Sequence, residues 1–63
     1  MYKVRANDPR GPVATFACGT PDQALDKVYE LIGRGMKNIR VIDPAGTERS
    51  GDAFKAMLLN GEL

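Results

Sequence analysis

Residues 20–36, TPDQALDKVYELIGRGM, have the pattern of one amphipathic helix. Thr20 suits the N-cap, Pro21 suits the first helical position, and Gln23 completes a Thr-x-x-Gln capping box. At about 100° per residue, the apolar positions fall within one arc roughly 160° wide. These positions are Pro21, Ala24, Leu25, Val28, Tyr29, Leu31, Ile32 and Met36. An arc this broad favours a helix that lies on a β-sheet.

The polar side and the C-terminal end of this helix can also be recognised in the sequence. The opposite side carries polar and charged residues, namely Gln23, Asp26, Lys27, Glu30 and Arg34. Two glycines near the end, Gly33 and Gly35, are candidate left-handed stops. A glycine loop that binds phosphate opens a helix, whereas this one closes it, so we interpret these glycines as a C-cap.

Residues 2–18, which precede the helix, predict a β-hairpin. Residues 2–6 alternate apolar and basic side chains, the period of a half-buried strand. Residues 7–11 contain Asp-Pro-Arg-Gly, which suits a type I turn. Residues 13–18 are β-branched, aromatic or small and predict the returning strand.

The second half of the chain follows a similar order. Residues 38–42 predict a strand rich in β-branched side chains, and residues 43–46 predict a second Asp-Pro-x-Gly turn. Residues 47–49 are either a short fourth strand or the exit of that turn. Ser50 is a candidate N-cap for a helix over residues 51–59, which Asn60 and Gly61 would end.

The two halves resemble each other at a constant offset. Residues 4–11 match residues 39–46, and each segment is followed by strand-like residues and a helix. The chain is therefore either a ββα unit used twice or two chance copies of a common turn. Both interpretations predict one α+β domain over residues 1–63, in the order ββαβ(β)α. Its antiparallel sheet has three or four strands, with both helices on one face.

Composition argues against several functional classes. The 63 residues include 9 Lys and Arg against 8 Asp and Glu, a formal charge of +1, so no general field attracts nucleic acid or an acidic membrane. No apolar run approaches the ~18 residues of a membrane helix. The first eight residues, MYKVRAND, lack the apolar core of a signal peptide. We therefore expect a cytoplasmic protein.

The residues that carry chemistry are few. Histidine is absent, and Asp22, Asp26 and Glu30 occupy the solvated side of the first helix, so the sequence predicts no enzyme and no cofactor. One thiolate, Cys18, does not make a metal site alone. Cys18 is either a thiol activated by the adjacent helix N-terminus or a small buried strand residue, and we favour the second.

Chain length favours oligomerisation. A domain this small buries only about 60% of its unfolded surface, and a single cysteine forms no internal disulfide. The last helix has one apolar stripe for the core: Ala53, Phe54, Met57 and Leu58. Ala56, Leu59 and Leu63 form a second stripe on roughly the other side. Either that end frays, or the stripe contacts a partner. We predict a homodimer through this helix, with exchange of the helix between subunits as one form.

The basic residues suggest an alternative function. Lys3, Arg5 and Arg40 fall on the polar faces of their strands and would cluster on the open side of the sheet as a phosphate contact. Two further cations, Arg10 and Lys37, are expected near its ends. Base stacking needs exposed aromatics, but alternation assigns Tyr2 to the core side and leaves Phe16 as the other candidate. The sequence thus predicts a non-enzymatic homodimeric interaction or accessory module, and alternatively a nucleic-acid-binding module.

Overall fold

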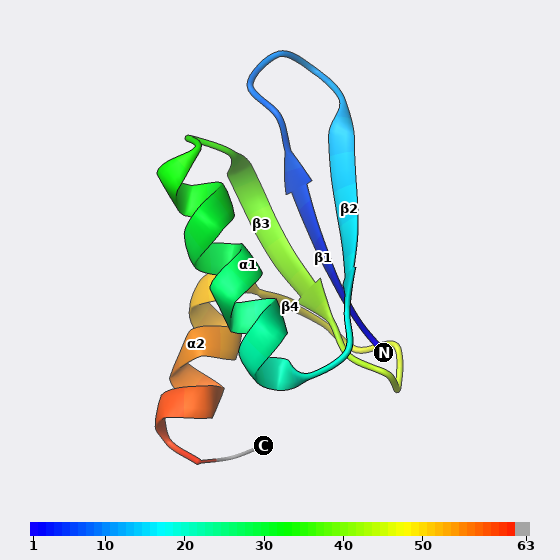
Figure 1. Ribbon diagram of the computed structural model, residues 1–63, viewed down its shortest axis with the longest axis vertical. Coiled ribbons are helices and arrows are strands. Elements are labelled where there is room, and N and C mark those ends of the chain that lie inside the picture. Colours follow the sequence, from blue (N-terminus) through cyan, green and yellow to red (C-terminus); the bar gives the residue numbers. More distant parts are fainter. Residues whose placement is uncertain (62–63) are drawn as a thin grey trace.

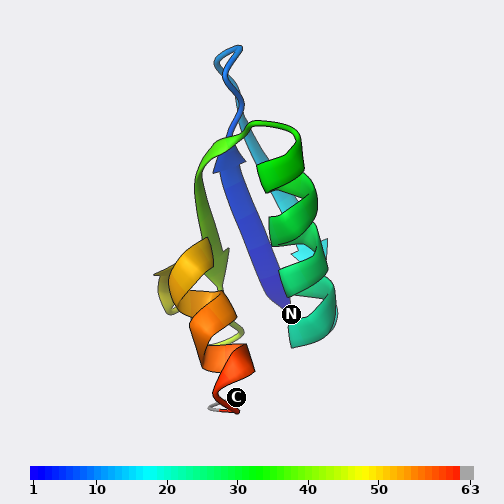
Figure 2. The same cartoon turned by 90° about the vertical axis from the view of Figure 1, so that its left-hand side faces the viewer.

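The computed structural model describes residues 1–61, which form one four-stranded sheet and two helices (Figure 1). The elements, in chain order, are β1 (Tyr2–Asn7), β2 (Val13–Cys18), α1 (Pro21–Gly33), β3 (Lys37–Ile42), β4 (Glu48–Ser50) and α2 (Gly51–Leu59). The strand order is β2-β1-β3-β4, and all neighbours are antiparallel. Both helices lie on the same side of the sheet (Figure 2). The predicted α+β class and element order are confirmed, and the segment after the second turn is a strand.

The start of α1 follows the predicted capping chemistry. The Thr20 hydroxyl accepts a hydrogen bond of 3.2 Å from the Gln23 amide, which satisfies one of the free N–H groups of the first turn. The Gln23 side chain reaches back and accepts a bond of 2.9 Å from the Gly19 amide. The residue before the N-cap, and not Thr20 itself, therefore completes the box.

The end of α1 comes earlier than the sequence predicts. The helix stops at Gly33, and Gly35 adopts a left-handed φ of +76°. The Gly35 amide donates to the Ile32 carbonyl at 3.0 Å, and the Met36 amide donates to the Leu31 carbonyl at 3.1 Å. These two bonds are a Schellman motif. The expected extension of the helix to Met36 is wrong, because the chain reverses at Gly35 and Met36 packs against the core.

The core lies between the sheet and the helices. Its buried apolar residues are Val4, Ala6, Cys18, Ala24, Val28, Leu31, Val41 and Phe54. Phe54 of α2 meets Tyr2 of β1 with ring centroids 5.9 Å apart, which joins the two ends of the chain. Ala53 was expected in the same apolar stripe, yet it is exposed. The buried side of α2 is centred on Phe54, and Ala53 lies 100° away from Phe54 around the helix axis, outside that side.

Glycine at position 51 lets the two helices approach. A Cβ built on Gly51 would lie 3.1 Å from Val28 Cγ1 of α1 and 3.4 Å from Ile39 Cγ2 of β3. A side chain at this position would require Val28, or the helix itself, to shift by a few tenths of an ångström. Close backbone approach thus brings Phe54, one turn further along, into the core.

The two turns are built alike. In residues 8–11 and 43–46, the glycine amide donates to the aspartate carbonyl at 2.9 Å. In both, the aspartate amide donates to the carbonyl four residues on, Pro12 or Thr47, at 3.0 Å. The sequence match between the halves is therefore also a structural match.

An approximate two-fold axis relates the first ββα unit (β1, β2 and α1) to the second (β3, β4 and α2). Arg5 and Arg40 occupy equivalent positions in the two units, and they are directly opposite each other in the β1–β3 pairing. The axis therefore passes between these two arginines. Thr20 and Ser50 cap α1 and α2 in the same way, by accepting a bond from the amide three residues on. The second unit is shorter, because β4 has three residues and leads directly into α2.

An ion pair distinguishes the second turn from the first and gives a pH-dependent prediction. Asp43 Oδ2 accepts a bond of 2.7 Å from Arg49 Nη1, and Oδ1 accepts one of 2.8 Å from the Thr47 amide. The Arg49 bond, followed by the Thr47 amide, lowers the pKa of Asp43 from its ordinary value of 3.8. In the first turn, Asp8 accepts from the Arg10 backbone amide instead.

We expect Asp43→Asn to lower the stability of the protein at neutral pH. A carboxyl whose folded pKa is depressed stabilises the fold above its unfolded pKa, and that contribution disappears as the pH falls through the folded pKa. The variant should therefore lose less stability than the wild type between about pH 5 and pH 3. Urea midpoints across this range measure the difference. Asp8→Asn is the control, and equal pH profiles for the two variants would contradict the role of Arg49.

Candidate functional site

The side of the sheet away from the helices carries the strongest cluster of like charge. Cross-strand partners share a face, and the pairs Lys3–Ile42, Arg5–Arg40 and Asn7–Lys37 lie opposite the buried Val4 and Ala6. We call this side the open face. Its four cations are Lys3, Arg5, Lys37 and Arg40.

Arg5 and Arg40 are the centre of this cluster. Like charges directly opposite on neighbouring strands destabilise a sheet, so their placement on the two-fold axis has a cost. Arg40 is held in place: Nε donates to the Asn38 carbonyl at 3.1 Å, and Nη2 donates to Asn7 Oδ1 at 3.5 Å. Its Nη1 lies 3.4 Å from Glu48 Oε1. Within residues 1–61, Arg5 has no such partner.

A β-bulge adds Lys37 to the same face. Arg5 pairs with Arg40, but Asn7 pairs with Lys37, so β3 has one extra residue between these pairs. Asn38 lies in the bulge with a φ of +53°, a conformation that asparagine tolerates better than most residues. A bulge shifts the alternation by one. Lys37 thereby joins Arg40 on the open face while Ile39 faces the core.

The predicted strand boundary is therefore corrected at this point. The sequence placed the start of the strand at Asn38 and Lys37 near the end of the face. The structure begins β3 at Lys37 and pairs it with Asn7. Arg10 lies in the exposed turn after β1, outside the paired strands. In the sequence, Asn38 is the residue that could have indicated the bulge, because asparagine adopts a left-handed backbone conformation more readily than most residues.

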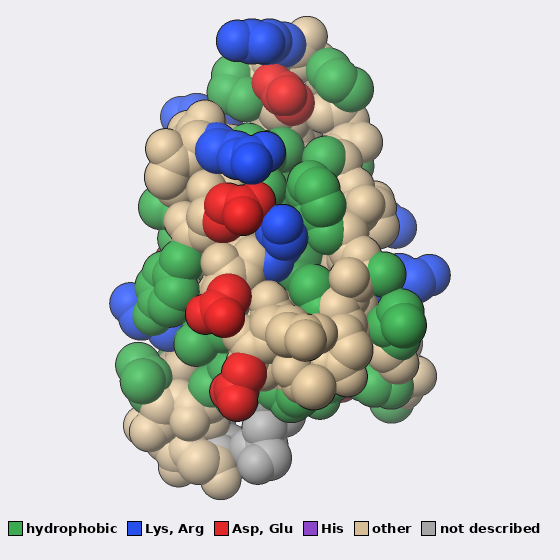
Figure 3. All heavy atoms as spheres, in the orientation of Figure 1, with side chains coloured by type: hydrophobic (Ala, Val, Ile, Leu, Met, Phe, Trp, Pro, Cys, Tyr) green, Lys and Arg blue, Asp and Glu red, His purple; other side chains and the backbone are tan. Residues whose placement is uncertain are grey.

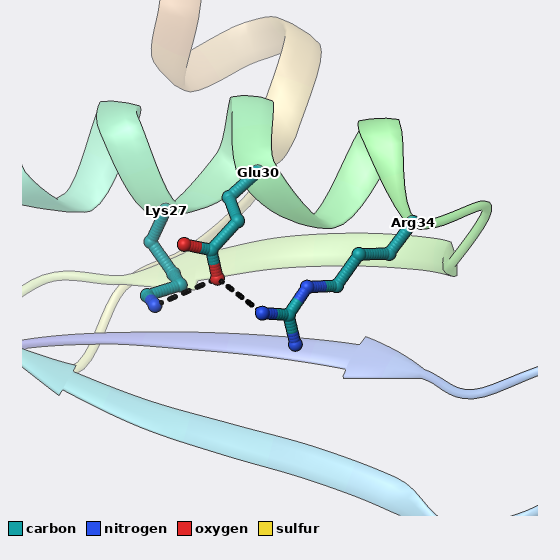
Figure 4. Close-up of polar contacts among 3 residues, drawn as sticks. All are labelled: Lys27, Glu30 and Arg34. Atoms are coloured by element: carbon teal, nitrogen blue, oxygen red, sulfur yellow. Dashed lines mark hydrogen bonds and ion pairs between the residues drawn. The ribbon is translucent and has the colours of Figure 1, made fainter.

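The helical side has a different charge distribution. Figure 3 shows acidic side chains along this side, interspersed with basic ones. Glu30 lies 3.0 Å from Lys27 and 3.4 Å from Arg34 in a short ion-pair chain along α1 (Figure 4). The Lys27 hydrogen bond lowers the pKa of Glu30. Among residues 1–61, one acidic side chain, Glu48, lies on the open face, together with the four cations. The open face is thus the positive side of a nearly neutral chain.

The aromatic residues do not lie on the open face. Tyr2 packs on Phe54 on the core side, which confirms the assignment from alternation. Phe16 pairs with buried Val4 and so faces the helices, with Lys27 Nζ 4.9 Å from its ring centroid. Tyr29 is on α1, where Lys55 Nζ lies 5.5 Å from its ring. The open face therefore offers cations and hydrogen-bond donors without a stacking platform.

The other candidate residues are placed as follows. Cys18 is 6% exposed and faces the core, which favours the small buried residue over an activated thiol. Asp22 and Asp26 are exposed on α1. In the described part of the chain, no three His, Cys, Asp or Glu side chains come together in a group suited to a metal ion. Neither α1 nor α2 combines the length and apolar character needed to cross a membrane.

The second stripe of α2 lies on the surface. Ala56 is exposed, and Leu59 is 72% exposed. Leu63 lies outside the described residues. This placement leaves the stripe open to a partner, as the predicted dimer contact requires, and the contact itself stays a prediction.

A hollow of about 290 Å³ lies between α1, the start of β3 and the start of α2. Its walls combine the apolar side chains of Val28, Ile32, Met36 and Ile39 with three polar residues, Asn38, Ser50 and Asp52. The Ser50 hydroxyl at its edge already accepts the Ala53 amide as the cap of α2. The polar groups of the hollow lie at the start of β3 and the start of α2.

Comparisons with known proteins found no match for this chain. No protein-family model matches the chain, and no curated protein or solved structure does so either.

Proposed function

We propose that this protein is a non-enzymatic binding module whose open face contacts the phosphates of a nucleic acid. The observation that carries the proposal is the placement of Arg5 directly opposite Arg40 on a face that no described helix covers. Two arginines in this arrangement repel each other in the free protein. A phosphate between them would relieve that repulsion and accept charge-assisted hydrogen bonds from both guanidinium groups.

Lys3 and Lys37 extend this contact along β1 and β3. Lys3 is two residues before Arg5 on the same side of β1, and Lys37 is brought to the face by the bulge. Successive positions on one side of a strand are about 6.6–6.8 Å apart, which is close to the spacing between phosphates in an extended nucleic-acid strand. The four cations therefore suit a phosphate backbone better than a single small anion.

The absence of aromatics from the open face argues for contacts to the backbone and not to bases. Sheet proteins that bind single strands stack bases on exposed aromatic rings, whereas the rings of Tyr2 and Phe16 face the helices. Phosphate contacts carry no sequence information, so binding should be insensitive to sequence. A single buried thiol and no disulfide in residues 1–61 fit work in a reducing compartment such as the cytoplasm.

Binding to a labelled duplex should be weak and should depend steeply on salt. If three or four cations each neutralise a phosphate, the logarithm of the association constant falls with the logarithm of the salt concentration with a slope of about −3. The affinity then drops roughly 40-fold or more between 50 and 200 mM salt. We expect Arg5→Gln to reduce this slope by about one and to weaken binding at low salt. Fluorescence anisotropy of a labelled duplex, with a single strand of the same sequence for comparison, measures both quantities.

Arg34→Gln is the matched control, because it removes the same charge from the helical side. Equal losses of affinity in the two variants would show that binding follows net charge and not the open face. Absence of binding to duplex and single strand at 50 mM salt would overturn the proposal.

The exposed stripe of α2 supports a second candidate, a homodimeric accessory module that binds through this helix. Leu59 is a large apolar side chain that is mostly exposed to water, and Ala56 lies beside it one turn away. Leu59→Glu should then convert a dimer into a monomer without loss of helix content. The oligomeric state by light scattering tests this candidate separately from nucleic-acid binding.

A further inference from the structure

The two edges of the sheet differ in how well they are protected against pairing. The β4 edge has only three residues, two of them charged (Glu48 and Arg49). The β2 edge has six residues, Val-Ala-Thr-Phe-Ala-Cys, without a charge, a proline or a bulge. Edge strands in stable monomers are usually blunted by such features. The β2 edge is therefore open to pairing with another strand.

The backbone groups that β2 presents at this edge follow from the hairpin. The Asp8 amide donates to the Pro12 carbonyl, which makes this the first hydrogen-bonded pair after the turn. Such pairs alternate along an antiparallel ladder, so Ala14, Phe16 and Cys18 bond to β1. The amides and carbonyls at positions 13, 15 and 17 consequently face away from the sheet.

We infer that the β2 edge pairs with the β2 edge of a second copy of this chain, antiparallel, with Thr15 opposite Thr15 of the partner subunit. In this register the outward groups at positions 13, 15 and 17 meet their counterparts in three hydrogen-bonded pairs, which supply about six backbone hydrogen bonds. The pairing is isologous, as a two-fold dimer requires.

Side chains on both faces are complementary in this register. On the open face, Val13 would lie opposite the small Ala17 of the other copy, and the two Thr15 side chains would meet at the axis. On the helical side, Phe16 would lie opposite Ala14. Large side chains therefore face small ones on both sides of the β2–β2 interface, which we call the seam. Val13, now 55% exposed, would gain an apolar neighbour.

The charges beside the seam carry both signs. Lys27, Glu30 and Arg34 lie on the flank of α1 above β1 and β2 (Figure 4). Two copies related by a two-fold axis run antiparallel, so cations of one flank can approach Glu30 of the other. A mixed polar rim of this kind surrounds most protein interfaces.

The assembly would close at two copies. Pairing consumes both β2 edges, and the edges that remain are the short, charged β4 strands. A two-fold axis perpendicular to the sheet keeps both open faces on the same side. With strands about 4.8 Å apart, the two Arg5–Arg40 pairs would lie about 19 Å apart on one eight-stranded sheet. The inference stands without the proposed function, because its tests measure association of the protein alone.

Thr15→Glu tests the seam. In the monomer the new carboxylate faces Arg5 and should be tolerated, whereas in the dimer two carboxylates meet at the axis. We expect a wild-type dimer in sedimentation equilibrium at micromolar concentration and a dissociation constant at least about tenfold higher for the variant. Thr47→Glu makes the same substitution in the other half of the chain and should leave the dimer intact. Circular dichroism checks that both variants fold.

A cross-link gives a second measurement that does not depend on a loss of association. In a Cys18→Ala background, Thr15→Cys should form a disulfide-linked dimer in air, because opposite Cα atoms about 5.5 Å apart suit a disulfide. Thr47→Cys in the same background should not do so at a comparable rate. Equal rates for the two variants, or a wild-type protein that stays monomeric at 100 µM, would overturn the inference. A dimer that Leu59→Glu dissociates and Thr15→Glu does not would also overturn it and place the contact on α2.

Discussion

Replacing Phe54 with alanine is expected to remove most of the stability of this protein. Phe54 is 1% exposed and is the largest fully buried side chain among residues 1–61. A buried phenylalanine truncated to alanine costs about 3–5 kcal/mol. A domain of 63 residues has a free energy of unfolding of roughly 3–9 kcal/mol. Urea titration followed by circular dichroism should therefore show a chain that is largely unfolded or only just folded in buffer.

Leu59→Ala on the same helix is the control for this effect. Leu59 is 72% exposed, so its truncation removes little buried surface and should leave the urea midpoint of the monomer almost unchanged. Similar losses from the two variants would contradict the orientation of α2 described above, in which Phe54 points inward and Leu59 outward.

Deletion of residues 50–63 is expected to abolish folding, and any dimer with it. The deletion removes Phe54 from its contact with Tyr2 and uncovers the side of β3 that α2 covers. Each large apolar side chain left in water forfeits about 1.5–3 kcal/mol of burial. The remaining ββαββ segment should show no cooperative thermal transition, measured by circular dichroism and calorimetry.

A chain that ends at Gly61 is the matched control, because it keeps α2 with its Asn60 cap and the bond from the Gly61 amide to Leu58. This chain, which keeps all the described residues, should show a cooperative thermal transition. If residues 1–49 instead fold cooperatively, the first ββα unit and β3 form a sufficient core, and the second helix serves another purpose.

Local chemistry explains why most elements could be predicted from the sequence. Thr20 and Ser50 mark the helix starts through side-chain bonds to the amides three residues on, an interaction within one turn. The two Asp-Pro-x-Gly turns form the same pair of backbone bonds. Alternation in β1 places Val4 and Ala6 in the core and Lys3 and Arg5 on the other side. These features depend on contacts close in sequence, and all of them were predicted.

Packing decided the points that local patterns left open or predicted wrongly. Both Gly33 and Gly35 suit a left-handed stop, and Gly35 is chosen because Met36 then packs against the core. Ala53 is apolar and lies at the border of the buried arc, so its exposure depends on how α2 sits on the sheet. Residues 47–49 carry little strand signal, and their neighbour β3 supplies the pairing that makes β4.

The sequence by itself determined the class of the fold, the starts of its helices, both turns and the side of the sheet on which Lys3, Arg5 and Arg40 lie, because period and capping are local properties. Only the tertiary structure decided that Arg5 and Arg40 meet on a two-fold axis and that a bulge at Asn38 adds Lys37 beside them. It also decided that β2, and not β1 or β3, is left with a free edge. Strand order and register depend on pairings between residues some 35 positions apart, and the energies of alternative pairings differ by side-chain packing that no local pattern contains.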